Sequence, residues 1–321
     1  MVLIGYHASH EQFAPRELID HVRLAEQAGF GGVMSSDHFA PWSKRQGQSG
    51  FAWTWLGAAM QATTLPFGLI TVPSGWRYHP AITAQASATL AQLFPGRFPW
   101  MAVGSGQALN EHVVGAPWPD KSGRNARLLA GVEIMRALWA GETIDRSEPI
   151  KIDDTKLYTL PDEPPRIIAG ALSVETARWA GSWADGLITV SQAREKLGDI
   201  VEAFRLGGGQ GKPLYLQVHI SHASSYDIAL ANAFDQWRNN AVTADMAETL
   251  RTPQEFDNAC SAVRPEDMHQ HVRISSDIGR HVAWLEEDAA MGFEQIYVHN
   301  VGRNQREFIE SFGNDVLPAF R

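Results

Sequence analysis

The hydrophobic pattern alternates along the whole chain between short apolar runs and longer amphipathic segments. Short runs that are almost entirely apolar predict strands of a parallel sheet that is buried on both faces. We predict eight such strands, at residues 3–8, 32–36, 67–72, 99–104, 166–171, 186–190, 214–221 and 295–300.

The amphipathic segments between these runs predict helices with one buried stripe. Residues 15–28 begin at Pro15, place Leu18 and Val22 on one face, and end before Gly29, which is typical of helix boundaries. Further helices are predicted at residues 80–94, 123–139, 174–183, 194–206, 277–291 and 304–312. Strand and helix alternate about eight times, which predicts a closed α/β barrel of the (β/α)₈ TIM type.

We expect residues 1–321 to form a single TIM-barrel domain with two insertions. Residues 143–160 alternate in a way that predicts a small β-hairpin, and residues 235–276 are helical and irregular. Long excursions at the ends of a barrel are commonly lids or interfaces.

Composition narrows the classes of function. The net charge of -9 and the pI near 5.7 disfavour nucleic acid as a partner. Cys260 is the only cysteine, so no internal disulfide can form, and no Cys/His spacing predicts a metal site. No apolar run predicts a membrane segment or a secretory signal, so a cytoplasmic location is expected.

Candidate chemistry is sought directly after the strands, because the catalytic mouth of a TIM barrel lies at their C-terminal ends. Asp37 and His38 follow the second strand, where a histidine oriented by a carboxylate can exchange a proton near neutral pH. A histidine hydrogen-bonded at a strand end is the alternative. Gly106 and Asn110 follow the fourth strand, where small residues let a planar cofactor approach. Taken alone, this segment is better explained by a structural turn.

The fifth strand ends in small residues, Ala169, Gly170 and Ala171, followed by Ser173 at an expected helix N-cap. This geometry suits an anion, although a plain helix cap accounts for it as well. Aromatic residues after the second and third strands are candidates for the wall of a pocket, namely Phe39, Trp42, Phe51, Trp53, Trp55 and Trp76. For Trp55 a place in the core of a helix is an equal alternative.

Several separated motifs occur in one order that matches a known family. They are EQFAPREL at 11–18, SDHFAPW at 36–42, RYHPA at 77–81, ALNE at 108–111, WADG at 183–186 and QREFIESF at 305–312. On these motifs the chain resembles, over nearly its whole length, the luciferase-like superfamily, and within it the branch of the F420-dependent glucose-6-phosphate dehydrogenases.

The resemblance implies a barrel whose mouth holds a flavin-type ring. The residues it implies around the cofactor are Asp37, Ile70, Thr71, Gly106, Asn110, Ala169, Gly170, Ala171 and Ser173. It also implies a cis peptide bond between Ile70 and Thr71 that supports the ring. By the same resemblance His38 is the base for a substrate hydroxyl, Trp42 lies over the reaction centre, and Glu11 is a further active-site acid.

The sequence departs from that branch at several positions. Where those dehydrogenases carry a glutamate that protonates the reduced deazaflavin, this chain has Gln107, which cannot deliver a proton. Ala193, Asn258 and His271 occupy positions where the family binds a sugar phosphate with basic residues. A phosphate dianion without such partners would be bound poorly.

A related clade, suspected to use FMN instead of F420, shares runs such as those at 46–53 and 299–305. We therefore expect an FMN-dependent oxidoreductase that performs hydride transfer or monooxygenation on a small neutral organic substrate, with a separate flavin reductase as a partner. The alternative is an F420-dependent dehydrogenase or reductase acting on an alcohol or sugar-like compound. A third hypothesis is a flavin-binding barrel without turnover. Barrels of this kind commonly pair, so a homodimer is expected.

Overall fold

The computed structural model describes residues 2–321, and its centre is a set of eight short parallel strands. They are β1 (Leu3–Ala8), β2 (Val33–Ser36), β3 (Phe67–Thr71), β4 (Trp100–Val103), β7 (Arg166–Gly170), β8 (Gly186–Val190), β9 (Leu214–Ser221) and β11 (Gln295–Asn300). Neighbours follow chain order from β1 to β9, β11 pairs with both β9 and β1, and every pairing is parallel. The sheet therefore closes, and the predicted barrel is confirmed with each strand within one residue of its expected bounds.

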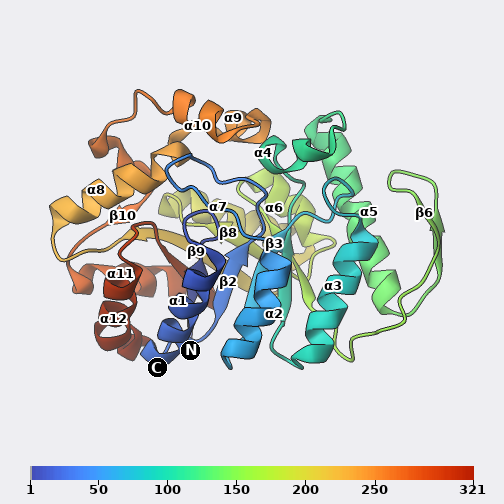
Figure 1. Ribbon diagram of the computed structural model, residues 1–321, viewed down its shortest axis with the longest axis horizontal. Helices are drawn as coiled ribbons and strands as arrows, with labels where there is room; N and C mark the ends of the chain where they lie inside the picture. The colour runs from blue at the N-terminus through green and yellow to red at the C-terminus, as the bar shows by residue number, and fades with distance from the viewer. Residues whose placement is uncertain (1) are drawn as a thin grey trace.

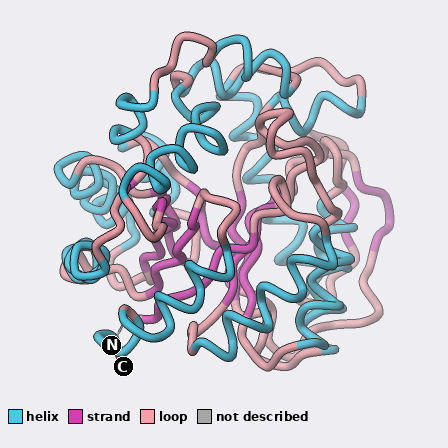
Figure 2. The backbone as a smooth tube through the Cα atoms, turned by 60° about the vertical axis from the view of Figure 1, so that its left-hand side comes forward, coloured by secondary structure: helices cyan, strands magenta, loops and turns pink. Residues whose placement is uncertain are grey.

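Helices surround the strands, as Figures 1 and 2 show. The outer ring consists of α1 (Pro15–Ala28), α2 (Ala52–Ala62), α3 (Pro80–Leu93), α5 (Lys121–Trp139), α6 (Val174–Gly181), α7 (Arg194–Phe204), α11 (Ile278–Ala289) and α12 (Gln305–Asp315). Four more helices are α4 (Ala108–Glu111), α8 (Tyr226–Trp237), α9 (Ala244–Thr249) and α10 (Pro253–Ala259). Within residues 2–321, no helix combines the length and apolarity needed to cross a bilayer.

Both expected insertions interrupt the repeat. The first contains the antiparallel pair β5 (Ile144–Arg146) and β6 (Ile152–Thr155), which confirms the predicted hairpin and projects to one side in Figure 1. The second contains α9, α10, a 3₁₀ turn at Pro265–Gln270 and the short strand β10 (Arg273–Ile274), which pairs with β9. In Figure 1, α9 and α10 lie beside α4 at the top of the view, on the side where the strands end.

Aromatic side chains fill the lower part of the barrel interior. Trp100 packs against Tyr215 and Tyr297 with ring centroids 5.3 and 5.5 Å apart, and its indole Nε1 donates to the Tyr297 hydroxyl at 3.2 Å. A Cβ on Gly68 would lie 2.0 Å from the Trp100 ring, and a Cβ on Gly5 would lie 2.4 Å from the Tyr297 ring. The two strand glycines therefore make room for the large rings that close the barrel floor.

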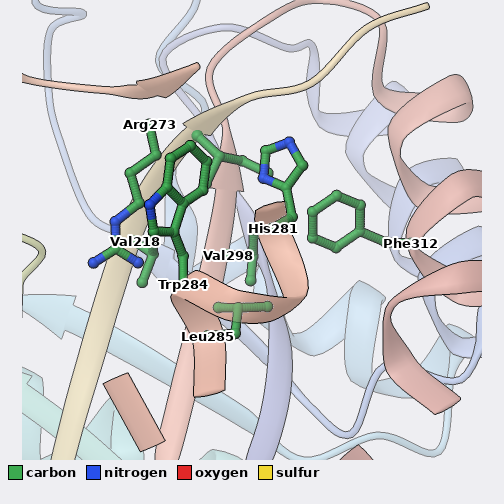
Figure 3. A pocket seen from close by; sticks show the side chains of 8 residues that line it. Val218, Arg273, His281, Trp284, Leu285, Val298 and Phe312 are labelled. Atoms are coloured by element: carbon green, nitrogen blue, oxygen red, sulfur yellow. The ribbon is translucent and has the colours of Figure 1, made fainter. Parts of the chain in front are cut away.

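Alternate strand residues face outward and hold the ring of helices. Val218 of β9 and Val298 of β11 contact the side chains of α11 and α12, among them His281, Trp284 and Phe312 (Figure 3). This layer packs on the outer side of the strands. The interior and the mouth are therefore formed by the other face of each strand.

The barrel floor generates a stability prediction. Replacing Gly68 by alanine forces a methyl group into the Trp100 ring, and overpacking of this kind costs about 1–3 kcal/mol. We expect Gly68→Ala to lower the midpoint of thermal unfolding clearly. Gly57→Ala is the matched control, because a Cβ at Gly57 in α2 meets nothing within 4 Å, and alanine favours a helix interior by about 0.5–1 kcal/mol. Equal midpoints for the two variants would contradict the argument.

Candidate active site

The barrel interior opens to solvent at the C-terminal ends of several strands. The inward-facing residues Ile70, Gly170, Val190 and His219 are partly exposed, whereas most strand residues are buried. A Cβ on Gly104 would meet nothing within 4 Å, and one on Gly170 would touch only the Val103 carbonyl oxygen at 3.6 Å. The β4 and β7 side of the mouth therefore has free space beside bare backbone, which fits a flat cofactor ring.

Glu11 and His38 meet at the mouth because they follow the neighbouring strands β1 and β2. One oxygen of the Glu11 carboxylate contacts His38 Nδ1, which is an ion pair whenever the imidazole is protonated, and the second oxygen accepts a hydrogen bond from the Ser9 hydroxyl at 2.9 Å. The Ser49 hydroxyl donates to the His38 carbonyl at 2.7 Å and fixes the backbone of the same loop. The contact with Glu11 engages Nδ1 and leaves Nε2 as the ring nitrogen that is not taken up by the carboxylate.

The electrostatics of this pair leave one nitrogen of His38 for chemistry. Burial raises the pKa of Glu11, but the charge and hydrogen bond of His38 outweigh it and hold that pKa at about 2. The carboxylate is therefore ionised at neutral pH and occupies Nδ1. Nε2 is then the atom that can accept or return a proton.

Trp42 lies between the histidine and the second insertion. Its ring is edge-on to His38 at 5.1 Å and to Phe256 of α10 at 5.3 Å. The other tryptophans expected in an aromatic wall have different partners: Trp53 packs on Phe98, Trp55 is buried in α2, and Trp76 packs on Trp118. The expected wall is therefore wrong for Trp53, Trp55 takes the alternative place in the core of a helix, and for Trp76, in the loop after β3, the place in a wall stays a prediction.

Asp37 is the centre of a buried polar network. Its carboxylate accepts hydrogen bonds from the Thr71 hydroxyl at 3.0 Å and from the Tyr78 hydroxyl at 3.1 Å. Arg77 lies 3.4 Å from the same carboxylate and 3.5 Å from that of Glu111, and its backbone N–H donates to Glu111 at 3.0 Å. Burial raises the pKa of Glu111, and the Arg77 guanidinium opposes that rise. The sequence placed Asp37 at the mouth by its position after a strand, but Arg77, Tyr78 and Glu111 entered only as letters of motifs and had no predicted role.

Helix α4 holds the loop that follows β2. The Asn110 side-chain oxygen accepts from the backbone N–H groups of Phe39 at 2.9 Å and Ala40 at 3.3 Å. Gly106, which precedes α4, has φ +94°, and a Cβ there would lie 3.1–3.2 Å from three neighbouring side chains. Gln107 caps α4 through its carbonyl oxygen, while its partly exposed side chain makes no hydrogen bond within the described residues.

The expected cis peptide bond between Ile70 and Thr71 is wrong. Within residues 2–321 the only cis bond joins Glu148 and Pro149. Strand β3 keeps regular parallel register with β4 through Thr71, and the Ile70 carbonyl accepts from the Asp37 N–H at 2.9 Å. A regular trans strand satisfies these bonds.

The fifth strand end presents only part of its expected site. Ala169 and Ala171 are buried, and the Ala171 N–H donates to the Ile188 carbonyl, so Gly170 is the member of this run that faces the mouth. The Ser173 hydroxyl accepts from the Thr176 N–H at 3.3 Å, which is the plain helix cap that the sequence left open. Whether any of these residues contacts a cofactor stays a prediction.

A group of neutral histidines lines the interior below the mouth on the β1, β9 and β11 side. His299 lies 4.4 Å from His7 and 5.6 Å from His219 between ring centroids. Gln12 donates through Nε2 to Gln236 and to a backbone carbonyl, so its oxygen must accept from His299 Nε2 at 2.9 Å. Burial lowers the pKa of His7 to about 4 and that of His219 to about 3. The described residues contain no cluster suited to a metal ion.

Comparison with known proteins places this geometry in a family. The model of the family described as luciferase-like monooxygenase matches residues 2–295. The chain belongs to this family. Among curated relatives of the family, the F420-dependent glucose-6-phosphate dehydrogenase of Intrasporangium calvum is 35% identical over 100% of this chain and 99% of its own length. The corresponding protein of Mycobacterium avium is 33% identical over 99% of this chain and 98% of its length.

Solved structures of two F420-dependent enzymes superpose over the full chain. An F420-dependent secondary alcohol dehydrogenase, in complex with an F420–acetone adduct, has a TM-score of 0.91 and 29% identity, covering 100% of this chain and 99% of its own. The F420-dependent tetrahydromethanopterin reductase of Methanopyrus kandleri has a TM-score of 0.79 and 19% identity over 100% and 99%, which supports the fold. The chain is thus a flavin- or deazaflavin-dependent oxidoreductase of the luciferase-like family.

The buried histidines generate a prediction about pH. Burial holds the pKa of His7 near 4, whereas in the unfolded chain the group takes up its proton near 6.5, so falling pH favours unfolding. Stability is fully present above about pH 6.5 and declines toward pH 4. Between pH 7 and 5 we expect His7 to account for about 2 kcal/mol of this loss. Urea unfolding at both pH values should show a smaller decline for His7→Gln than for the wild type.

His269 provides the control, because its ring is exposed beside Tyr226. The His269→Gln variant should keep the wild-type decline in the free energy of unfolding. If His7→Gln declined as steeply as the wild type, burial of His7 would not be the source of the acid sensitivity.

Proposed function

We propose that the chain is an F420-dependent dehydrogenase or reductase that interconverts a small uncharged alcohol and its carbonyl compound. The observation that carries the proposal is the contact between the buried Glu11 and the partly exposed His38, with Trp42 against the histidine, at the mouth of the barrel. The names of the relatives support the deazaflavin over the FMN expected from the sequence. The space beside Gly104 and Gly170 fits the ring of such a cofactor.

The residues of the site would divide the work of alcohol oxidation. The bound cofactor would supply the hydride acceptor. His38 Nε2 would take the hydroxyl proton as the carbon–oxygen double bond forms, and the Glu11 carboxylate would stabilise the resulting imidazolium. Trp42, held edge-on against the histidine, would cover the reacting carbon and exclude water.

The charge distribution supports an uncharged substrate. The positions where the resembling dehydrogenases bind a phosphate hold Ala193, Asn258 and His271, and burial lowers the pKa of His271, which disfavours a cation there. Arg77 is committed to Asp37 and Glu111. A phosphorylated sugar would therefore lack a cationic partner at these positions.

An FMN-dependent enzyme fed by a separate reductase is the second candidate, and Gln107 is the observation that favours it. Its side chain is free within the described residues and can hydrogen-bond to a ring, but it cannot supply the proton that a glutamate gives. A barrel without turnover is disfavoured by the intact Glu11–His38 pair. The homodimer and the cytoplasmic location stay predictions.

Cofactor titration tests the proposal directly. Binding is followed by the change in fluorescence of the cofactor or of the protein. We expect F420 to bind with an affinity at least tenfold higher than that of FMN. Gly170→Val should weaken binding at least tenfold at an unchanged unfolding midpoint, because a Cβ there meets only one protein atom within 4 Å. Tighter binding of FMN would overturn the deazaflavin assignment in favour of the second candidate.

Variants of the ion pair test the roles of its two members. General acid–base catalysis contributes about 10²–10⁴-fold, so His38→Ala should lower kcat by that order while the affinity for the cofactor stays the same. Glu11→Gln should lower kcat by about tenfold or more, because the amide cannot stabilise the imidazolium. Steady-state kinetics with a panel of small secondary alcohols measures both. Full turnover by His38→Ala would remove the histidine from the chemistry.

A further inference from the structure

Helix α10 of the second insertion binds the loop that carries Trp42 through hydrogen bonds and an ion pair. The Asp257 carboxylate accepts hydrogen bonds from the Ser43 hydroxyl at 2.6 Å and from the Lys44 N–H at 3.1 Å, and it forms an ion pair with Arg45 at 3.1 Å. The side chain of Lys44 also donates to Gln254, one turn earlier on the helix, at 2.5 Å. One carboxylate therefore binds three consecutive residues of a loop that is more than two hundred positions away in the chain.

The same contact reaches the ring of Trp42. Phe256, which precedes Asp257, is fully buried and packs edge-on against Trp42, and the Trp42 ring also packs edge-on against His38. The Trp42 N–H donates to the Gln46 side chain at 3.0 Å, and this bond closes the turn around the three residues that Asp257 binds. Trp42 is thus fixed both through its ring and through the backbone that follows it.

The insertion is also anchored on its other side. Glu248 of α9 forms an ion pair with Arg124 of α5, and its carbonyl oxygen accepts from the Trp118 indole at 3.1 Å. Figure 1 shows α9 and α10 side by side at the top of the view, with α9 next to α4. The segment therefore spans from the β4 side of the mouth to the β2 side.

We propose that Asp257 is a positioning residue that holds Trp42 against His38, so that the insertion determines the geometry of the catalytic mouth. Only 14% of the Asp257 side chain is exposed. Its carboxylate binds three donors at once, namely the Ser43 hydroxyl, the Lys44 N–H and the Arg45 guanidinium. An asparagine of the same shape has one acceptor oxygen, so its NH₂ group must face at least one donor. The catalytic part of the inference rests on the function proposed above, while the positioning part does not.

The experiment uses a signal from Trp42 that requires no turnover. The full-length protein is labelled with 5-fluorotryptophan, and among the resonances of its 11 tryptophans that of Trp42 is assigned with Trp42→Phe. We expect Asp257→Asn to shift or broaden the Trp42 resonance. Gln254→Ala on the same helix loses the contacts of its side chain with the Lys44 amine and with Asn258, but none with Asp257, and should leave the resonance in place. An unshifted, equally sharp Trp42 resonance in Asp257→Asn would overturn the proposal.

Ser43→Ala is a second variant that removes one donor from the loop side and preserves the helix. It should move the Trp42 resonance in the same direction as Asp257→Asn, by less. Failure of both variants to move it would count against Asp257 even if one of them folded poorly.

A double-mutant cycle connects the positioning to catalysis. Asp257→Asn should lower kcat about tenfold or more, with the cofactor affinity unchanged, and should have little further effect in a Trp42→Ala background. Equal effects in both backgrounds would show that Asp257 does not act through Trp42. Failure of the cofactor titration would overturn the proposed function alone, because the fluorine signal of Trp42 does not depend on a cofactor.

Discussion

The guanidinium of Arg77 lies between two buried carboxylates, and the arrangement of the mouth depends on it. Asp37 and Glu111 are each about 2% exposed, and Arg77 lies within 3.5 Å of both. Two such acids without a cation would face both desolvation and mutual repulsion, and breaking a buried pair costs about 3–5 kcal/mol. Because the three residues follow β2, β3 and β4, this one contact fixes three consecutive loops relative to one another.

The mouth separates charged from neutral groups in a way that suits proton transfer. On its rim, the Glu11 carboxylate holds the histidine that faces the reaction, and it remains ionised because His38 offsets the cost of burial. Below, on the β1 and β11 side, His7 and His299 are kept neutral by burial. Neutral rings beside His38 add no charge that would compete for the Glu11 carboxylate. The charges of the site are therefore confined to the contacts of Glu11 with His38 and of Arg77 with Asp37 and Glu111.

Sequence periodicity was sufficient for the barrel, since buried parallel strands and amphipathic helices repeat with recognisable lengths. It also brought Asp37 and His38 to the mouth, because position after a strand decides that. The network around Asp37 was not predictable in this way. Arg77 and Glu111 are 34 positions apart in the sequence, and nothing in the sequence pattern shows that the fold brings them into contact. Asp257 lies in an irregular insertion with no period, and the expected cis bond at Ile70 came from resemblance and not from local chemistry.

The closure of the barrel between β1 and β11 has a consequence for how the chain reaches this state. Leu3 pairs with Gln295, so the first strand has no partner on one edge until nearly the whole chain is available. Contacts of such long sequence separation form slowly, and an unpaired parallel edge is prone to association with other chains. During synthesis, one edge of β1 therefore stays unpaired, and open to pairing with other chains, until β11 has been synthesised. Late closure makes the folding of this barrel sensitive to the conditions in which its final third emerges.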